Sequence, residues 1–525
     1  MARRGCTACS ARGPASLVVV VRASKVPMKI QRALLTSALV PACVAIGACS
    51  VNGSDDPGME AGGAVATAGV AGAATGGSPV AGSGVGGSNP GMAGAAVAGA
   101  SAGGGLPLAG SSSGGSGAGV AGSGVAGGVA GGAAGTGSVP VTGMVEDDGV
   151  GCTVAALPDA GALTTNAKLP DPFKKLDGTR MTTKAEWRCR RQEIKKLAEK
   201  FAFGTKPGKP ETLMGTVAGT TITIKVTDKG KSSSFTASIK LPTGGSAPYP
   251  AIVVYGGASF PPPLDSSVIN GEGVAIINYD PYVVGKETGK RAPKSGAFYD
   301  IYGADSTTGL LVAWGWGVSR IIDAIEQSDG KILKADAVGV TGCSRFGKGS
   351  FIAGVFDQRI ALTLPIESGS AGVPIWRGIP GEGAQSLSSA YGEQPWFGDA
   401  FSAFTSSPTK APLDTHEAVA MVAPRGLFIM DNPSIANLGP KSAHVAALAG
   451  AEVYKALGAG SNISYVSAVA NGSHCAERPE WKTPLRDNIQ KFLKKNGNVP
   501  GVIAAASKAT GELSTWKDWE TPTLN

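Results

Sequence analysis

The sequence predicts an α/β protein, a three-layer αβα sandwich around a mostly parallel central sheet. Two observations support this fold class. Short, nearly continuous apolar runs recur in the chain after residue 150, and segments of helical character separate them. Strands that are apolar throughout are typical of parallel sheets buried on both faces. Their alternation with helices is typical of a sheet covered on both sides.

Several apolar runs are predicted as strands, and these cover residues 250–255, 274–279, 337–342, 360–366, 426–430 and 463–466. The first run ends at Gly256-Gly257, which predicts a tight turn. A long helix is predicted over residues 308–327, with Trp314 and Trp316 near its middle. The last run leads into a Gly/Ser-rich loop that carries His474.

Residues 1–49 are predicted to be a targeting signal. Basic residues precede a short uncharged apolar run, residues 33–46, which is too short to span a bilayer comfortably. Residues 46–49 (IGAC) resemble a bacterial lipobox, in which Cys49 would be lipidated and become the mature N-terminus. A start at Met28 would give this signal an ordinary layout. The alternative is an ordinary cleaved signal in which Cys49 has no role.

Residues 50–150 are predicted to be a disordered tether, and residues 151–525 a single catalytic domain. The tether is rich in Gly, Ala, Ser and Val, so it cannot bury enough apolar surface to offset the entropy of ordering. An adhesive or β-rich segment is the alternative. The net charge of +8 is spread thinly, without the dense basic runs that nucleic-acid binding needs, so no nucleic-acid partner is expected.

Ser344 is the candidate nucleophile. It follows the predicted strand 337–342 after one residue, Cys343, as in the nucleophile elbow of the α/β-hydrolase fold. Gly342 stands two residues before it, but Phe346 occupies the place where the generic G-x-S-x-G pattern has its second glycine. The chain order of serine, acids and then His474 is the order this fold requires.

His474 is the candidate base, because a histidine can carry a proton near neutral pH. The chain contains two other histidines. His444 lies in an alanine-rich helical stretch, and His416 precedes a predicted strand, so both are expected to be structural. Three histidines without a metal-binding spacing predict no metal site.

Residues 340–349 (VTGCSRFGKG) resemble the G-C-S-R-x-G-K signature of glucuronoyl esterases, carbohydrate esterase family 15. Further similar segments follow the family's order across most of the predicted domain, and these are residues 298–303, 313–324, 359–369, 392–397, 423–427 and 472–475. The resemblance implies an α/β-hydrolase fold and a serine esterase.

The resemblance also implies roles for individual residues. Ser344 would be the nucleophile, His474 the general base and then acid, and Glu367 the carboxylate that orients His474. Asp431 is the rival acid, because it ends the next strand, where many other α/β-hydrolases carry theirs. Arg345 would stabilise the oxyanion through its backbone N–H and its guanidinium.

Four residues are expected to contact the sugar: Lys348, Gln385, Glu393 and Trp376. One departure from the family concerns Asn437, which stands where many members have a tryptophan at the sugar site. The resemblance further implies disulfides between Cys343 and Cys475 and between Cys152 and Cys189. A third pair found in fungal members has no counterpart here, because Ile375 precedes Trp376-Arg377.

The implied substrates are glucuronoxylan and lignin–carbohydrate esters, hydrolysed without a cofactor. Two alternatives stay open: an esterase for another acyl group, such as an acetyl or methyl-uronate ester, and a surface-tethered glycan-binding protein. The chain is expected to be a secreted monomer that meets the membrane only through its lipid anchor, at the bacterial outer membrane or cell surface.

Overall fold

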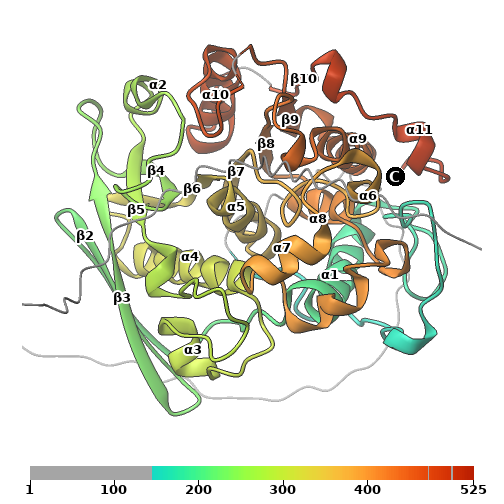
Figure 1. Ribbon diagram of the computed structural model, residues 1–525. Coiled ribbons are helices and arrows are strands. Elements are labelled where there is room, and N and C mark those ends of the chain that lie inside the picture. Colours follow the sequence, from blue (N-terminus) through green and yellow to red (C-terminus); the bar gives the residue numbers. More distant parts are fainter. Residues whose placement is uncertain (1–144, 471, 498–499) are drawn as a thin grey trace, which may run out of the picture. The chain divides into compact units, whose positions relative to one another are not determined.

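The computed structural model describes residues 145–525 except 471, 498 and 499 (Figure 1). The predicted signal with Met28 and Cys49, and nearly all of the predicted tether, therefore lie outside the described residues. The strands are β1 (Thr212–Ala218), β2 (Thr221–Asp228), β3 (Lys231–Lys240), β4 (Tyr249–Tyr255), β5 (Ala275–Tyr279), β6 (Leu333–Cys343), β7 (Ile360–Ile366), β8 (Gly426–Met430), β9 (Ile463–Val466) and β10 (Ile503–Ala504). The helices are α1 (Trp187–Ala198), α2 (Ser266–Gly271), α3 (Ala297–Tyr302), α4 (Leu310–Gln327), α5 (Arg345–Phe356), α6 (Ile379–Glu382), α7 (Leu387–Glu393), α8 (Thr415–Val422), α9 (Pro440–Ala456), α10 (Lys482–Asn488) and α11 (Leu513–Trp516).

The strands form one sheet in the order β1-β2-β3-β5-β4-β6-β7-β8-β9-β10. From β5 to β10 every neighbouring pair is parallel, whereas β1, β2, β3 and β5 pair antiparallel. The predicted mostly parallel sheet is confirmed. The bounds of β7, β8 and β9 coincide with the predicted runs, and β4, β5 and β6 differ from theirs by one to four residues.

Helices cover both faces of the sheet. Along β4, Ala251 and Val253 belong to a large core that includes residues of α1, α4, α5, α8 and α9. Their neighbours Ile252 and Val254 belong to a second core on the opposite face, with residues of α2 and α10. Successive side chains of a strand point to opposite faces, so the two cores establish the three layers.

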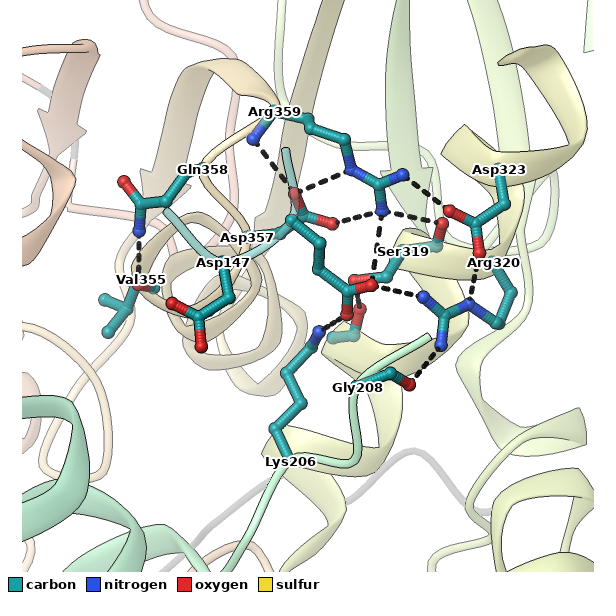
Figure 2. Close-up of polar contacts among 12 residues, drawn as sticks. Asp147, Lys206, Gly208, Ser319, Arg320, Asp323, Val355, Asp357, Gln358 and Arg359 are labelled. Carbon is teal, nitrogen blue, oxygen red and sulfur yellow. Dashed lines mark hydrogen bonds and ion pairs between the residues drawn. The ribbon is translucent and has the colours of Figure 1, made fainter. Parts of the chain in front are cut away.

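The N-terminal arm, residues 146–148, corrects the predicted domain boundary at residue 151. Glu146 forms ion pairs with Lys206 and Arg320 and lies 3.7 Å from Arg359. These three cations are at most 6% exposed, and Figure 2 shows them converging on one cluster. The tether prediction therefore fails at its last residues, because their partners lie far along the chain and leave no mark on local composition.

Within residues 145–525, no helix combines the length and the apolar character that crossing a bilayer requires.

Candidate active site

Ser344 occupies the sharp turn between β6 and α5. Its backbone has φ 58° and ψ −124°, a strained conformation for a residue other than glycine. Two glycines make the turn possible. A Cβ at Gly342 would lie 2.5 Å from the Phe346 carbonyl oxygen, and a Cβ at Gly347 would lie 2.4 Å from the Ile366 carbonyl oxygen. After the serine, the close approach of the β7 backbone is to residue 347 rather than to residue 346. The turn therefore tolerates a phenylalanine at position 346.

Two disulfides predicted from the family resemblance are confirmed. Cys343–Cys475 joins the residues next to Ser344 and His474, with a Cα–Cα distance of 5.9 Å. Cys152–Cys189 fastens the start of the domain to α1, with a Cα–Cα distance of 5.3 Å. Such bonds persist in oxidising compartments. The first bond brings the loop of His474 to the elbow from 132 residues further along the chain.

Glu367 contacts the candidate base. It follows β7 directly, is fully buried, and lies with its Oε2 2.6 Å from Nδ1 of His474. The same oxygen accepts the Cys475 N–H at 2.9 Å. The other oxygen faces Asn432 Nδ2 and Arg478 Nη2, each at 3.4 Å. These donors fix the carboxylate against a His474 side chain that remains 41% exposed.

Asp431, the rival acid, has different partners. Its carboxylate accepts the Asn432 N–H at 2.9 Å and faces the Tyr465 hydroxyl at 3.4 Å. Burial raises the pKa of Asp431 to about 7. The geometry thus favours Glu367 over Asp431 as the partner of His474.

Arg345, the first residue of α5, is held by acidic side chains. Its Nη1 lies 2.6 Å from Glu287 Oε2, and its Nη2 lies 3.6 Å from Glu393 Oε1. Glu287 also accepts the Trp396 indole N–H at 2.6 Å and the Tyr282 hydroxyl at 3.0 Å. Sequence reasoning missed Glu287, because a single acid in a basic loop carries no local signal of its partner.

Lys348 lies one turn further along α5 and is only 4% exposed. Its Nζ donates to the Ser368 carbonyl oxygen at 2.6 Å and lies 4.9 Å from the ring centre of Trp396. Burial lowers the pKa of Lys348 to about 8. Gln385 donates to Glu393 at 2.7 Å, so these two predicted sugar contacts form one polar cluster with Arg345. Lys348 adjoins this cluster through the Trp396 ring, which Arg345 also faces at 5.7 Å.

Trp376 does not join this cluster, and its prediction as a sugar contact is wrong. It is 1% exposed and packs against Phe401, with ring centres 4.8 Å apart. A ring covered in this way has no face free for a sugar. Asn437, in contrast, is exposed, and its carbonyl oxygen accepts the Gln385 N–H at 3.0 Å.

The other two histidines have structural partners. His416 is buried in α8, where Nε2 lies 2.9 Å from the Pro170 carbonyl oxygen and burial lowers its pKa to about 4. Nδ1 of His444 accepts the Gly511 N–H at 3.1 Å. Near the elbow, four potential ligand atoms from Cys343, Cys475, Glu367 and His474 lie within 4.8 Å of one another. The two sulfurs are bonded to each other and so are not thiolate ligands.

Comparison with known proteins decides the family. Residues 224–458 match the family model described as "Glucuronyl esterase, fungi". A 4-O-methyl-glucuronoyl methylesterase of Hypocrea jecorina is 40% identical over 380 residues, which are 71% of this chain and 80% of the relative. The chain belongs to the glucuronoyl esterase family. A second relative of that name, from Neurospora crassa, is 38% identical and covers 71% of this chain and 93% of its own length.

Solved structures of glucuronoyl esterases agree with this assignment and with the α/β-hydrolase fold. The catalytic domain from Hypocrea jecorina superposes with a TM-score of 0.64 at 40% identity, covering 70% of this chain and all of that one. A serine-to-alanine mutant from Sporotrichum thermophile, in complex with methyl 4-O-methyl-β-D-glucopyranuronate, superposes with a TM-score of 0.64 at 37% identity. The match covers 71% of this chain and 100% of that one. A family 15 enzyme from Caldicellulosiruptor kristjansonii gives 0.60 at 29% identity, covering 69% and 98%.

Proposed function

We propose that this chain hydrolyses esters of glucuronic acid, in particular those that join the 4-O-methyl-glucuronic acid of xylan to lignin alcohols. One observation carries the proposal: a disulfide joins the neighbours of an elbow serine and of a histidine, and Nδ1 of that histidine lies 2.6 Å from a buried glutamate. This arrangement occurs in a family whose curated members are named 4-O-methyl-glucuronoyl methylesterases.

The reaction passes through an acyl-enzyme. His474, held by Glu367 at Nδ1, takes the Ser344 hydroxyl proton at Nε2 while Oγ attacks the uronate carbonyl carbon. The tetrahedral intermediate collapses, the C–O bond to the alcohol breaks, and His474 returns the proton to the leaving alcohol. Water then attacks the acyl-enzyme, giving its proton to His474, and Ser344 leaves with that proton.

Arg345 stabilises the oxyanion of both tetrahedral intermediates. Its backbone N–H stands at the N-terminus of α5, where helix dipoles favour negative charge. Its guanidinium is held by Glu287 at 2.6 Å, so little reorganisation is needed when charge develops.

Lys348, Gln385 and Glu393 hydrogen-bond the hydroxyls of the glucuronoyl ring. Asn437 stands where many family members have a tryptophan at the sugar site. This difference supports a second candidate function, an esterase for an acetyl or other methyl-uronate group. A glycan-binding protein would not need the His474–Glu367 contact, so that alternative is disfavoured.

The enzyme is secreted, which its disulfides support. We propose in addition that it is a monomer anchored at the bacterial outer membrane through lipidated Cys49. Cys49→Ala in the full chain would then move the protein from the detergent phase to the aqueous phase on phase separation, and unchanged partitioning would contradict the anchor.

Hydrolysis of methyl 4-O-methyl-glucuronate and of an aryl acetate by the full chain, compared side by side, tests the acyl specificity. The proposal predicts a much higher kcat/KM for the uronate ester. Turnover of the acetate alone would favour the second candidate.

A further inference from the structure

A buried arginine stands next to the acid of the proposed triad and has no role in the mechanism above. Arg478 follows His474 by four residues, and its side chain is 0% exposed. Its Nη2 lies 3.4 Å from Oε1 of Glu367, whereas Oε2 is the oxygen that faces His474. A charge removed from water is costly unless a partner compensates it, so a buried arginine at this place calls for a reason.

The hydrogen bonds of Arg478 differ from those of other buried arginines. Arg359 and Arg377 each donate from Nε, Nη1 and Nη2 to acceptors around them. In Arg478, Nε and Nη1 are buried without an acceptor among the described residues. The guanidinium lies 5.6 Å from the ring centre of Trp481 and directs Nη2 at Glu367. An arginine that served only to stabilise the core would have its donors satisfied.

Arg478 connects the acid to the loop of the base. The nitrogen that faces Glu367 also donates to the carbonyl oxygen of Ser473, the residue before His474. Asn432 bridges the same two acceptors, because its Nδ2 lies 3.4 Å from Glu367 Oε1 and 3.2 Å from the Ser473 carbonyl oxygen. These shared donors determine how the carboxylate of the acid is oriented against the loop that carries the base.

The charge of Arg478 also affects proton transfer. Before attack His474 is neutral, so Arg478 is the positive charge that offsets the buried carboxylate of Glu367. Without this charge the carboxylate would take up a proton more readily and could no longer accept the Nδ1 hydrogen bond. Where the carboxylate stayed ionised, His474 would hold its own proton more strongly, because a nearby positive charge is gone. Both effects move the acidic limb of the pH–rate profile to higher pH.

Asp431 is a second acid that interacts with Glu367 through its charge. Burial raises the pKa of Asp431 to about 7. Asp431 is therefore mostly protonated in the acidic range, where the limb of the pH–rate profile is measured. A displacement of the limb in this range then reports on Glu367, His474 and the cation beside them.

We propose that Arg478 is a positioning residue for the reaction, which acts through Glu367 by orienting its carboxylate toward His474 and by supplying its counter-charge. The contact with the Ser473 carbonyl oxygen holds the guanidinium in place for this task. Arg478 is not a catalytic residue, because it faces the acid and not the reacting atoms. This inference rests on the proposed function.

The kinetic test records kcat/KM for methyl 4-O-methyl-glucuronate against pH in the full chain. In Arg478→Met the midpoint of the acidic limb rises by about 1 in pH, and kcat at about pH 6 falls roughly tenfold. Arg478→Lys keeps a positive charge, so its limb stays within about 0.3 of the wild-type midpoint. Arg486→Met is the matched control, since Arg486 lies on α10 with its side chain 47% exposed. An unmoved limb in Arg478→Met, or an equal displacement in Arg486→Met, overturns the proposal.

A second variant keeps the test decisive if Arg478→Met alone does not fold. Combined with Glu367→Gln, the substitution no longer leaves a buried carboxylate without its counter-charge. Because Arg478 acts through the acid, Arg478→Met lowers kcat by less than about threefold in the Glu367→Gln background. A loss in that background as large as in the wild-type background means that Arg478 acts independently of Glu367, and it overturns the proposal.

Inactivation by phenylmethanesulfonyl fluoride separates this inference from the proposed function. The reagent sulfonylates the Ser344 hydroxyl with loss of fluoride, so it requires the activated serine but no particular ester. Its second-order rate constant, measured against pH, has an acidic limb that moves upward in Arg478→Met if the inference holds; an unmoved limb overturns it. A wild type that reacts with the reagent but does not hydrolyse methyl 4-O-methyl-glucuronate would instead count against the proposed function.

Discussion

Glu367→Gln is the substitution whose effect the structure defines best. The change keeps the shape of the side chain and removes its charge. In wild type, one carboxylate oxygen faces His474 and the Cys475 N–H, and the other faces Asn432 and Arg478. An amide offers one acceptor oxygen and one NH₂ group, so either His474 or Arg478 must face a donor instead of an acceptor.

The expected loss is large in kcat and small in KM. Removing the charge reduces the stabilisation of the His474 imidazolium that forms during attack, and it favours the wrong tautomer of His474. In serine hydrolases such a change lowers kcat by about 10⁴-fold. At about 1.4 kcal/mol for each factor of ten, this loss is about 5.5 kcal/mol of transition-state stabilisation. Ground-state binding of the sugar does not involve Glu367, so KM changes by less than about threefold.

Asp431→Asn is the matched control, because Asp431 is an equally buried acid that ends the neighbouring strand. Its effect on kcat should stay within about threefold. Steady-state kinetics on methyl 4-O-methyl-glucuronate measures both variants, with circular dichroism as a check on folding. If Glu367→Gln keeps more than about a tenth of wild-type kcat while Asp431→Asn loses most of it, Asp431 is the working acid and the reasoning fails.

Three further outcomes follow from the structure. As pH rises through about 8, Lys348 loses its proton, so KM for the uronate ester increases. Lys348→Gln abolishes this pH dependence of KM. A KM that does not change with pH in wild type would contradict the proposed contact between Lys348 and the sugar. Glu287→Ala lowers kcat about 10²-fold, because it releases the Arg345 guanidinium. The double variant Glu287→Ala/Arg345→Ala shows no further loss of kcat. Additive losses in the double variant would mean that Glu287 and Arg345 act independently. Glu146→Ala lowers the free energy of unfolding in urea by about 3–5 kcal/mol, because the buried cations Lys206 and Arg320 lose their counter-charge. The control Asp147→Ala lowers the free energy of unfolding by less than about 1 kcal/mol. Equal losses in the two variants would contradict this account.

Asp431 also gives a pH dependence of stability with a defined sign. Burial raises its pKa to about 7 from an unfolded value near 4, so the native state binds more protons between these values. Its contribution to stability is therefore present below pH 4 and is lost as pH rises through 7. Relative to wild type, Asp431→Asn becomes more stable at pH 8 than at pH 4, as urea unfolding at the two pH values would measure.

The parallel part of the fold was predictable because its strands are buried on both faces. Residues 360–366 and 426–430 are nearly continuous apolar runs, and the structure gives β7 and β8 the same bounds. The antiparallel strands β1 to β3 were missed. Their buried residues alternate with exposed Thr, Ser and Lys, as in β3, so no continuous apolar run marks them.

The candidate site was predictable where a motif fixes the local backbone. Ser344 on its elbow followed from a short segment and from the order of residues in the chain, and the two disulfides followed from the family resemblance. Glu287 and the half-buried Glu146 depend on partners 58 and 174 residues away in the chain. Trp376 was placed wrongly because a motif position does not reveal which rings cover a side chain in the core.

The most direct test of the central claim is the turnover of methyl 4-O-methyl-glucuronate by the full chain and its Ser344→Ala variant. The account predicts readily measured hydrolysis by wild type and a loss of about 10⁶-fold in kcat when the nucleophile is removed. Hydrolysis that survives in Ser344→Ala at a rate near that of wild type would contradict the assignment of Ser344 and the acyl-enzyme mechanism with it.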